Sequence, residues 1–530
     1  MQGRTGAHRE GGFEMGRVSA QQFVDLVVDP GSFGPLPSRG TTTADAVYAA
    51  ELAAAQEATG LDESVLCGTS RVGGQEVVLV AGEFGFLAGS IGVVTSDLIL
   101  AAFDHATEHQ MPLLVSPCSG GTRMQEGTPA FVQMVKIGQA VRAHRRAGLP
   151  YLAHLRHPTT GGVLASWASL GHYTTAQPGA MVGFLGPRVQ EALTGRRIED
   201  GIQRAENLER VGVIDAVVAD ECVRSLWLRW LDAIGPAHER QGSGVGPVTP
   251  RATGAPVDMA GKAALADAPT DPWPAVQASR ADDRPGVLDV VAACGGTAVW
   301  FSGTGDGRVD PTIKAGPVRW CGRPLMLVGM CRDTQTHHEL GPAGLRIAQR
   351  AFAVAQELGL PVVTMIDTPG AELSAWAENH GLSGEIARTL GSLAELTVPT
   401  VSVILGEGGG GAALSMLPAD RTLVAASGWL SPIAPEGASA IMGRSGGDAA
   451  AMARAHRIGA HDLVAMGVAD AIIPEPDDWS TPPLGPEALS SRGHFCDAVG
   501  VAVLEQVEEL AAIPTDERLA ARRERFRAVG

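Results

Sequence analysis

The chain has 530 residues, more than one hydrophobic core usually organises, and this length predicts about two to four domains. Its formal net charge is -17 and no basic face stands out, so we expect no nucleic-acid partner. No apolar run of about 18 residues occurs and no secretory leader is visible, so we expect a cytoplasmic protein without a membrane span.

Strand and helix signals divide the chain into segments. Residues 1–17 are polar and are predicted to be a disordered tail. Residues 18–235 and 285–530 are rich in short apolar runs that alternate with helical stretches, so we expect one domain in each. Residues 236–284 are rich in Gly, Pro, Ala and Asp with little apolar periodicity, which predicts a linker.

The two predicted domains share a plan. Predicted strands begin at Pro112 and Pro150 in the first domain and at Pro361 and Pro399 in the second, with 38 residues between the prolines of each pair. Each half also closes with a Gly-Val-x-Asp-Ala motif, at residues 212–216 and 467–471. Three matches in the same order indicate an internal duplication. Strand–turn–helix alternation predicts parallel strands with right-handed crossovers, and hence an α/β fold.

Glycine-rich turns follow equivalent strands of the two halves. Gly161 and Gly162 follow one strand, and Gly411, Ala412 and Ala413 follow its counterpart. Backbone N–H groups at such a turn have no internal acceptor, and two of them aimed at one oxygen form an oxyanion hole. The alternative is a tight turn that only allows close packing of helix and strand. Recurrence at equivalent points of a repeat favours the oxyanion hole.

Other motifs do not point to a metal ion or a nucleophile. The seven cysteines include no C-x-x-C pair, which argues against a disulfide framework and a four-cysteine zinc site. His105 and His109 fit the spelling H-x-x-E-H, but no third ligand is evident, so we expect no metal there. Cys118 has no catalytic partner at a recognisable spacing. The C-terminal arginines, including Arg518 and Arg522, are predicted to lie on a solvated helix.

Longer segments resemble a known family. PLLVSPCSGGTRMQEG (112–127), HPTTGGVLASWASLG (157–171), AMVGFLGPRV (180–189) and IQRAENLERVGVIDAVV (202–218) resemble the β subunit of the bacterial acetyl-CoA carboxylase carboxyltransferase. LPVVTMIDTPGA (360–371), GEGGGGAAL (406–414), SPIAPEGASAIM (431–442) and ADAIIPEP (469–476) resemble its α subunit. The resemblance implies two crotonase-like (ClpP/crotonase) β-β-α superhelix domains fused in one chain.

The resemblance also implies an activity and a set of site residues. The family moves CO2 from carboxybiotin to the α-carbon of a coenzyme A thioester, for which we expect acetyl-CoA and formation of malonyl-CoA. Gly161 and Gly162 would hold the enolate oxygen of the thioester, and Gly411, Ala412 and Ala413 the ureido oxygen of biotin. Substrate or cofactor binding is assigned to Gly120, Gly121, Arg123, Gly186, Arg188 and Gly370.

Partners and alternatives follow from what the sequence lacks. No biotin-attachment Met-Lys-Met and no ATP-grasp pattern occur, so biotin carboxylase and the biotin carboxyl carrier protein are expected to be separate chains. The zinc ribbon of the bacterial β subunit is absent, so no zinc is expected. Sites of this family form between two chains, which predicts a homo-oligomer, either dimer or hexamer. An acyl-CoA decarboxylase of the same superfamily and a non-catalytic scaffold that binds acyl-CoA or the carrier remain alternatives.

Overall fold

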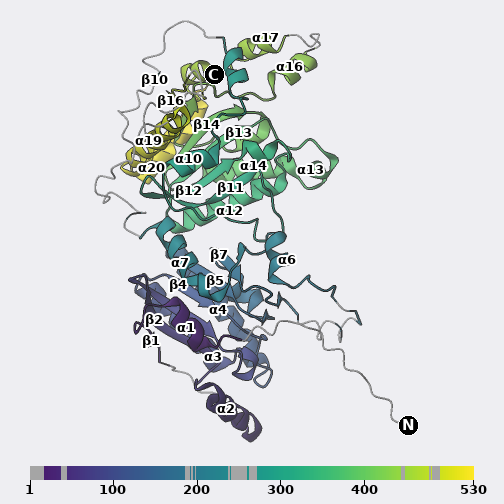
Figure 1. Cartoon of the computed structure of the whole chain (residues 1–530), viewed down its shortest axis with the longest axis vertical. Helices are drawn as coiled ribbons and strands as arrows, with labels where there is room; N and C mark the ends of the chain where they lie inside the picture. The colour runs from purple at the N-terminus through teal and green to yellow at the C-terminus, as the bar shows by residue number, and fades with distance from the viewer. Residues whose placement is uncertain are drawn as a thin grey trace.

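The computed structural model describes residues 17–37, 44–185, 191, 195–196, 198–236, 239, 260–261, 271–442, 448–476, 479 and 490–529. Figure 1 shows two lobes stacked along the long axis, with the first half of the chain in the lower lobe and the second half in the upper lobe. Each lobe contains a seven-stranded sheet with helices packed against it.

The first sheet has the order β1-β2-β3-β4-β5-β7-β9. Strands β3 to β9 are parallel, and β1 and β2 form an antiparallel edge. The strands are β1 (Gly34–Pro35), β2 (Val65–Val72), β3 (Gln75–Gly82), β4 (Leu113–Ser116), β5 (Tyr151–Leu155), β7 (Tyr173–Ala176) and β9 (Ala216–Val217). Strands β6 (Thr159–Thr160) and β8 (Val182–Gly183) form a separate pair. The helices are α1 (Ala20–Val27), α2 (Ala46–Thr59), α3 (Val93–Glu108), α4 (Thr128–Arg146), α6 (Ala205–Arg210) and α7 (Asp220–Ile234), with short turns at Leu87–Gly89 and Leu164–Ala168.

The second sheet has the order β10-β16-β15-β14-β13-β12-β11 and repeats the plan of the first. An antiparallel hairpin, β11 and β12, again precedes a parallel run from β12 to β16. The strands are β10 (Ala260–Gly261), β11 (Ile313–Trp320), β12 (Arg323–Met330), β13 (Val362–Thr368), β14 (Thr400–Gly408), β15 (Arg421–Ala425) and β16 (Ala471–Ile473). The helices are α9 (Trp273–Ala278), α10 (Val287–Ala293), α11 (Arg332–Gln335), α12 (Pro342–Leu358), α13 (Ala375–Asn379), α14 (Leu382–Ala394), α15 (Gly410–Ser415), α16 (Pro435–Ile441), α17 (Ala449–Ala455), α18 (Ala460–Ala465), α19 (Ser491–Ala511) and α20 (Thr515–Arg527).

The aspartate of the duplicated Gly-Val-x-Asp-Ala motif makes the same pair of hydrogen bonds in both halves. Asp215 donates its N–H to the Thr174 carbonyl at 2.7 Å, and its carboxylate accepts the Thr174 N–H at 2.9 Å. Asp470 makes the same two bonds with Thr422, both at 2.7 Å. Each aspartate therefore satisfies the backbone hydrogen bonds of a residue near the start of a strand, β7 in one half and β15 in the other.

The two halves share one buried apolar cluster. Phe23, Trp227 and Trp230 from the first half lie in it together with Phe301 and Phe352 from the second. Helix α7, which carries both tryptophans, packs against β11 and β12. Burial of large apolar side chains is the main favourable contribution to the free energy of folding. The two halves are therefore held together by a shared hydrophobic core as well as by the chain that connects them.

Ion pairs cross the same interface. Arg350 of α12 binds the Asp215 carboxylate through two bonds of 2.8 Å. Arg145 of α4 pairs with Glu357 of α12 at 2.7 Å, and His172 lies 3.1 Å from the same carboxylate. Helix α12 of the second half thus packs directly against the first half.

Two expectations from the sequence need correction. Parts of the segment 236–284 belong to the second lobe: β10 pairs with β16, and α9 packs in a small core that includes Trp429. Arg518 and Arg522 are 4% and 3% exposed and are not solvated. Arg522 binds the buried Asp420 carboxylate through two bonds of 2.8 Å, so α20 is part of the core. Within the described ranges, no helix is long and apolar enough to cross a membrane.

Candidate active site

Two glycine turns with the same conformation follow β5 and β14. Gly161 has a φ of 67° and donates its N–H to the Phe184 carbonyl at 2.9 Å. Gly410 has a φ of 65° and donates its N–H to the Ser431 carbonyl, also at 2.9 Å. This left-handed conformation is strained for residues with a side chain, which explains glycine at both positions.

A second pair of turns follows the neighbouring strands β4 and β13. Gly121 has a φ of 114° and donates its N–H to the Ser119 hydroxyl at 3.0 Å. Gly370 has a φ of 151° and donates to the Thr368 hydroxyl at 3.2 Å. The turns within each half touch: a Cβ atom on Gly121 would lie 3.4 Å from the Gly161 Cα. Each candidate site is therefore built from two adjoining turns at the carboxyl edge of a parallel sheet.

The amide groups of Gly162 and Gly411 are free to bind an oxygen. Neither N–H has a hydrogen-bond acceptor among the residues that the structure describes. The N–H of Gly161, by contrast, already donates a hydrogen bond to the Phe184 carbonyl. The first turn therefore presents a free amide at Gly162, which can donate a hydrogen bond to an oxygen.

The correspondence between the halves differs by one residue from the prediction. The sequence pattern sets Gly161 and Gly162 against Gly411, Ala412 and Ala413, but the structure matches Gly161 with Gly410 and Gly162 with Gly411. Ala412 and Ala413 are fully buried in the core. The prediction missed Gly410, although the constant offset between the paired prolines would have identified it.

Arg123 lies in a buried network of hydrogen bonds and not at the surface. Its side chain is fully buried and binds both carboxylate oxygens of Glu63 at 2.8 Å. It also donates to the Ser90 carbonyl at 2.7 Å and the Ser64 hydroxyl at 3.1 Å. These contacts fix the loop after Gly121, so the structure assigns Arg123 to support of the turn and not to contact with a ligand.

The remaining predicted binding residues divide into two groups. Gly120 donates its N–H to the Ala88 carbonyl at 2.8 Å, and it lies with Gly121 beside the first turn. Gly370 occupies the equivalent place beside the second. Gly186 and Arg188 lie outside the described residues.

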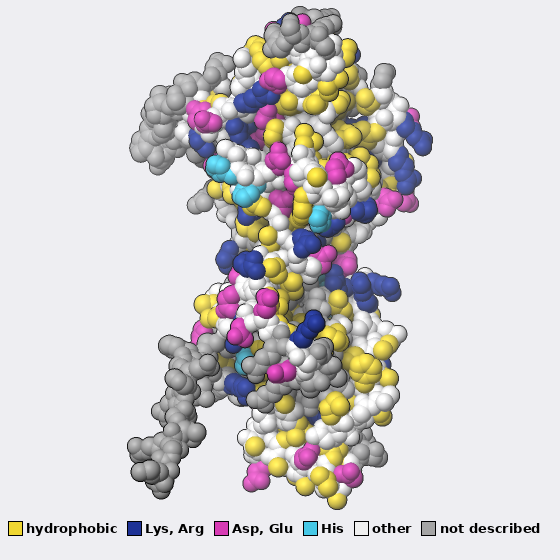
Figure 2. Space-filling view, turned by 90° about the vertical axis from the view of Figure 1, so that its right-hand side faces the viewer, with side chains coloured by type: hydrophobic (Ala, Val, Ile, Leu, Met, Phe, Trp, Pro, Cys, Tyr) yellow, Lys and Arg dark blue, Asp and Glu magenta, His cyan; other side chains and the backbone are white. Residues whose placement is uncertain are grey.

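Exposed apolar side chains border both turns. A Cβ atom on Gly162 would lie 3.4 Å from Met134 of α4, and the outer face of α4 exposes Phe131 and Val135, each to 63%. Leu414, which is 48% exposed, follows the second turn on α15. Figure 2 shows hydrophobic side chains at the surface of both lobes. Such patches mark binding grooves or protein interfaces.

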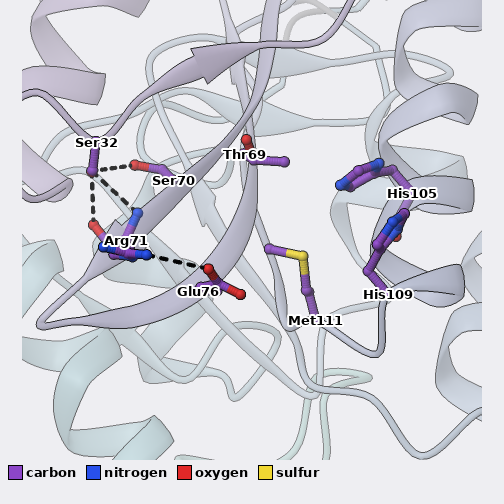
Figure 3. A pocket seen from close by; sticks show the side chains of 8 residues that line it. All are labelled: Ser32, Thr69, Ser70, Arg71, Glu76, His105, His109 and Met111. Atoms are coloured by element: carbon purple, nitrogen blue, oxygen red, sulfur yellow. Dashed lines mark hydrogen bonds and ion pairs between the residues drawn. The ribbon is translucent and has the colours of Figure 1, made fainter.

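The two histidines of the H-x-x-E-H spelling lie elsewhere. The rings of His105 and His109 stack at 4.0 Å and line a hollow of about 510 Å³ with Arg71, Glu76 and Met111 (Figure 3). Met111 precedes β4, so this hollow lies at the opposite edge of the sheet from the glycine turns. In the described part of the chain, no group of three or more His, Cys, Asp or Glu side chains could hold a metal ion.

Comparison with known sequences matches both halves. A family model described as acetyl co-enzyme A carboxylase carboxyltransferase-like matches residues 265–530. A probable biotin-dependent acyl-coenzyme A carboxylase beta3 subunit of Mycobacterium tuberculosis is 47% identical over 519 residues, which cover 97% of this chain and 99% of that protein. The acetyl-coenzyme A carboxylase carboxyl transferase subunits beta/alpha of Salinispora tropica are 37% identical over 527 residues, covering 97% and 91%.

Comparison with solved structures supports the fold. Transcarboxylase 12S, solved with methylmalonyl-coenzyme A and methylmalonic acid, matches with a TM-score of 0.70 at 20% identity and covers 94% of this chain and 90% of its own. A single-chain, multi-domain long-chain acyl-CoA carboxylase matches with a TM-score of 0.62 at 19% identity, over 97% of this chain and 46% of its own. The predicted crotonase-like fold is confirmed. Together with the sequence matches, it shows that the chain belongs to the carboxyltransferase family of the biotin-dependent acyl-coenzyme A carboxylases, with β-like and α-like halves in one polypeptide.

Proposed function

We propose that this carboxyltransferase moves a carboxyl group from carboxybiotin on a separate carrier protein to the α-carbon of a short acyl-CoA, and that acetyl-CoA, converted to malonyl-CoA for fatty acid synthesis, is the principal substrate. The observation that carries the proposal is the pair of free amides at Gly162 and Gly411, held in matching turns of the two halves. The relatives named as acetyl-CoA carboxylase subunits support the choice of acyl group.

The two turns receive different oxygens in this proposal. Gly162 donates to the thioester oxygen as it becomes an enolate oxygen, and Gly161, tethered to Phe184, sets the direction of that amide. Gly411 donates to the ureido oxygen of biotin. Bound carboxybiotin supplies both the CO2 and the base that removes the α-proton. Preorganised amides stabilise charge only as it develops, which is why the site needs no side chain as acid or base.

A second copy of the chain completes the site in this proposal. Exposed apolar side chains border both turns, and pairing the first half of one copy with the second half of another would cover them. The hexamer assembly of transcarboxylase 12S, whose fold this chain shares, supports an arrangement of this kind. Size-exclusion chromatography with light scattering tests it, and a fully active monomer would contradict it.

The proposed partners are a separate biotin carboxylase and a separate biotin carboxyl carrier protein. The proposed compartment is the cytoplasm, because all seven cysteines are free thiols and a reducing environment keeps them so.

A panel of acyl-CoA substrates tests the function. The purified chain is combined with biotin carboxylase, biotinylated carrier, ATP and labelled bicarbonate, and then with acetyl-, propionyl- or butyryl-CoA. We expect label in the acyl-CoA, with the highest kcat/KM for acetyl-CoA. If label enters none of the three, carboxylation is the wrong activity. Loss of CO2 from malonyl-CoA without any biotin would instead identify a decarboxylase, and binding without turnover a scaffold.

A further inference from the structure

Strand β14 bulges just before the second glycine turn. Its pairing with β13 runs in register up to Ile366 and Ile404 and then resumes at Thr368 and Gly408, so that Asp367 faces three residues of β14. The bulge takes the Glu407 N–H out of the ladder. Asp367 replaces the lost acceptor, because its Oδ1 accepts that N–H at 3.0 Å. Bulges of this kind commonly re-aim a chain beside an active site.

The Asp367 carboxylate is buried at considerable cost. The residue is 2% exposed, and its Oδ2 has no hydrogen-bond partner within the described residues. Arg284 lies beside it, with Nη1 3.8 Å from Oδ2, and that Nη1 is also without a hydrogen bond there. The rest of the Arg284 guanidinium is used by the Leu405 carbonyl and the Glu475 carboxylate. A half-satisfied buried charge destabilises a fold, so its presence here suggests a function that outweighs this cost.

The first half shows that the repeat itself does not require this carboxylate. Its strands shift register at the same place, between the Val115–Ala153 pair and the bridge from Ser119 to Thr159. There Cys118 stands where Asp367 stands, and Pro158 stands where Glu407 stands. Proline has no N–H, so the first bulge leaves no donor that needs an acceptor. The aspartate is therefore particular to the second turn.

Asp367 is connected to the free Gly411 amide through the short segment that begins at Glu407. From Glu407 the chain runs through Gly409, whose N–H donates to the Thr368 carbonyl at 2.9 Å, to the tethered Gly410 and then to Gly411. A Cβ atom on Gly406 would lie 2.4 Å from Asp367 Oδ1, so the carboxylate packs tightly against the strand. Displacing the carboxylate would move the bulge and, with it, the turn.

We propose that Asp367, paired with Arg284, is a positioning residue that holds the Gly411 amide in place for the carboxyl donor. The inference rests on the proposed role of the second turn as the biotin side of the reaction. It adds that this side depends on an ionised carboxylate at the bulge, where the first half has Cys118 instead. Carboxyl transfer should therefore be lost when Asp367 is protonated.

The charges around Asp367 define the pH range. Burial raises the pKa of Asp367 to about 6, against the opposing effects of Arg284, Arg332 and the Glu407 N–H, while the Glu407 carboxylate adds to the increase. Glu475 binds Arg284 at 2.6 Å and competes for its charge. The ionised form predominates above pH 6 and is lost below it, so the wild type should lose activity as the pH falls through about 6.

Two substitutions separate positioning from mere packing. Asp367→Asn keeps the shape and an acceptor oxygen but removes the charge, so at pH 7.5 it should behave as the wild type does in acid, with no further loss at lower pH. Asp367→Ala removes the acceptor, and we expect the KM for the biotinylated carrier to rise about 10- to 100-fold while the KM for acyl-CoA stays constant. Cys118→Ala at the equivalent place in the first half is the control and should change neither KM.

Hydrogen exchange gives a readout that does not need activity. In Asp367→Ala, amides of the 405–411 segment should exchange faster than in the wild type, while the 156–162 segment stays unchanged. Unchanged exchange, an unchanged carrier KM, or an increase confined to the acyl-CoA KM would each overturn the inference. If the wild type itself fails to transfer a carboxyl group, the proposed function fails, and the exchange experiment still decides whether Asp367 holds the turn.

Discussion

Arg350 and Arg525 bind equivalent aspartates in the two halves but differ in how deeply the pairs are buried. The Asp215 side chain, bound by Arg350, is fully buried, whereas the Asp470 side chain, bound by Arg525, is 35% exposed. Both arginines also donate to backbone carbonyls, of Gly303 and Val468 respectively. Substitution of each arginine by methionine therefore removes the same chemistry from two different environments.

The burial of the aspartate sets the expected magnitude. Arg350→Met leaves a buried carboxylate uncompensated, which costs about 3–5 kcal/mol. Arg525→Met leaves a carboxylate that water reaches, and an exposed pair contributes only about 0–1 kcal/mol. At about 1 °C per kcal/mol for a chain of 530 residues that unfolds as one unit, Arg350→Met should lower the midpoint of thermal unfolding by roughly 3–5 °C and Arg525→Met by less than about 1 °C.

Thermal unfolding followed by tryptophan fluorescence measures both variants, because Trp227 and Trp230 lie in the core that joins the halves. Equal shifts for the two variants, or a larger shift for Arg525→Met, would refute the argument that the Asp215 pair is the more deeply buried connection. A shift confined to Arg350→Met is the result that the difference in burial predicts.

Three further outcomes are expected. Gly162→Val should lower kcat by a factor of about 10²–10³ without unfolding the protein, because the added side chain displaces the Gly162 amide. Gly138→Ala is the control: a Cβ atom there meets nothing within 4 Å, so kcat should not change. Arg123→Met should lower the free energy of unfolding by about 3–5 kcal/mol, because it leaves the buried Glu63 carboxylate uncompensated, and chemical denaturation measures this loss. Burial opposes ionisation of Glu357, but His172 and Arg145 outweigh it and lower its pKa to about 2 from the ordinary 4.5. The stability from Glu357 is therefore present above pH 4.5 and lost as the pH falls toward 2, and Glu357→Gln should show a flatter decline in acid unfolding.

Features set by local sequence were predictable. The strands that directly follow Pro112, Pro150, Pro361 and Pro399, and the glycine turns after them, are visible because proline and glycine have restricted or special backbone conformations. The duplication is visible for the same reason, since its markers recur at a constant spacing.

Features set by distant neighbours were not predictable. The N–H of Gly161 is consumed by Phe184, 23 residues later, so the sequence could not tell which glycine keeps a free amide. Arg123 lies in a glycine-rich motif typical of ligand binding, but its side chain is buried against Glu63, 60 residues earlier, and against Ser64 and Ser90. The sequence predicts a solvated Arg522 because its partner, Asp420, is 102 residues away along the chain.

Single-turnover transfer tests the central claim most directly. Carrier protein carrying labelled carboxybiotin is freed of ATP and biotin carboxylase and then mixed with acetyl-CoA and this chain alone. The wild type should form labelled malonyl-CoA, and Gly162→Val and Gly411→Val should not, although both unfold at the wild-type temperature. No transfer by the wild type, or transfer at the wild-type rate by both variants, would contradict the assignment of carboxyl transfer to these two turns.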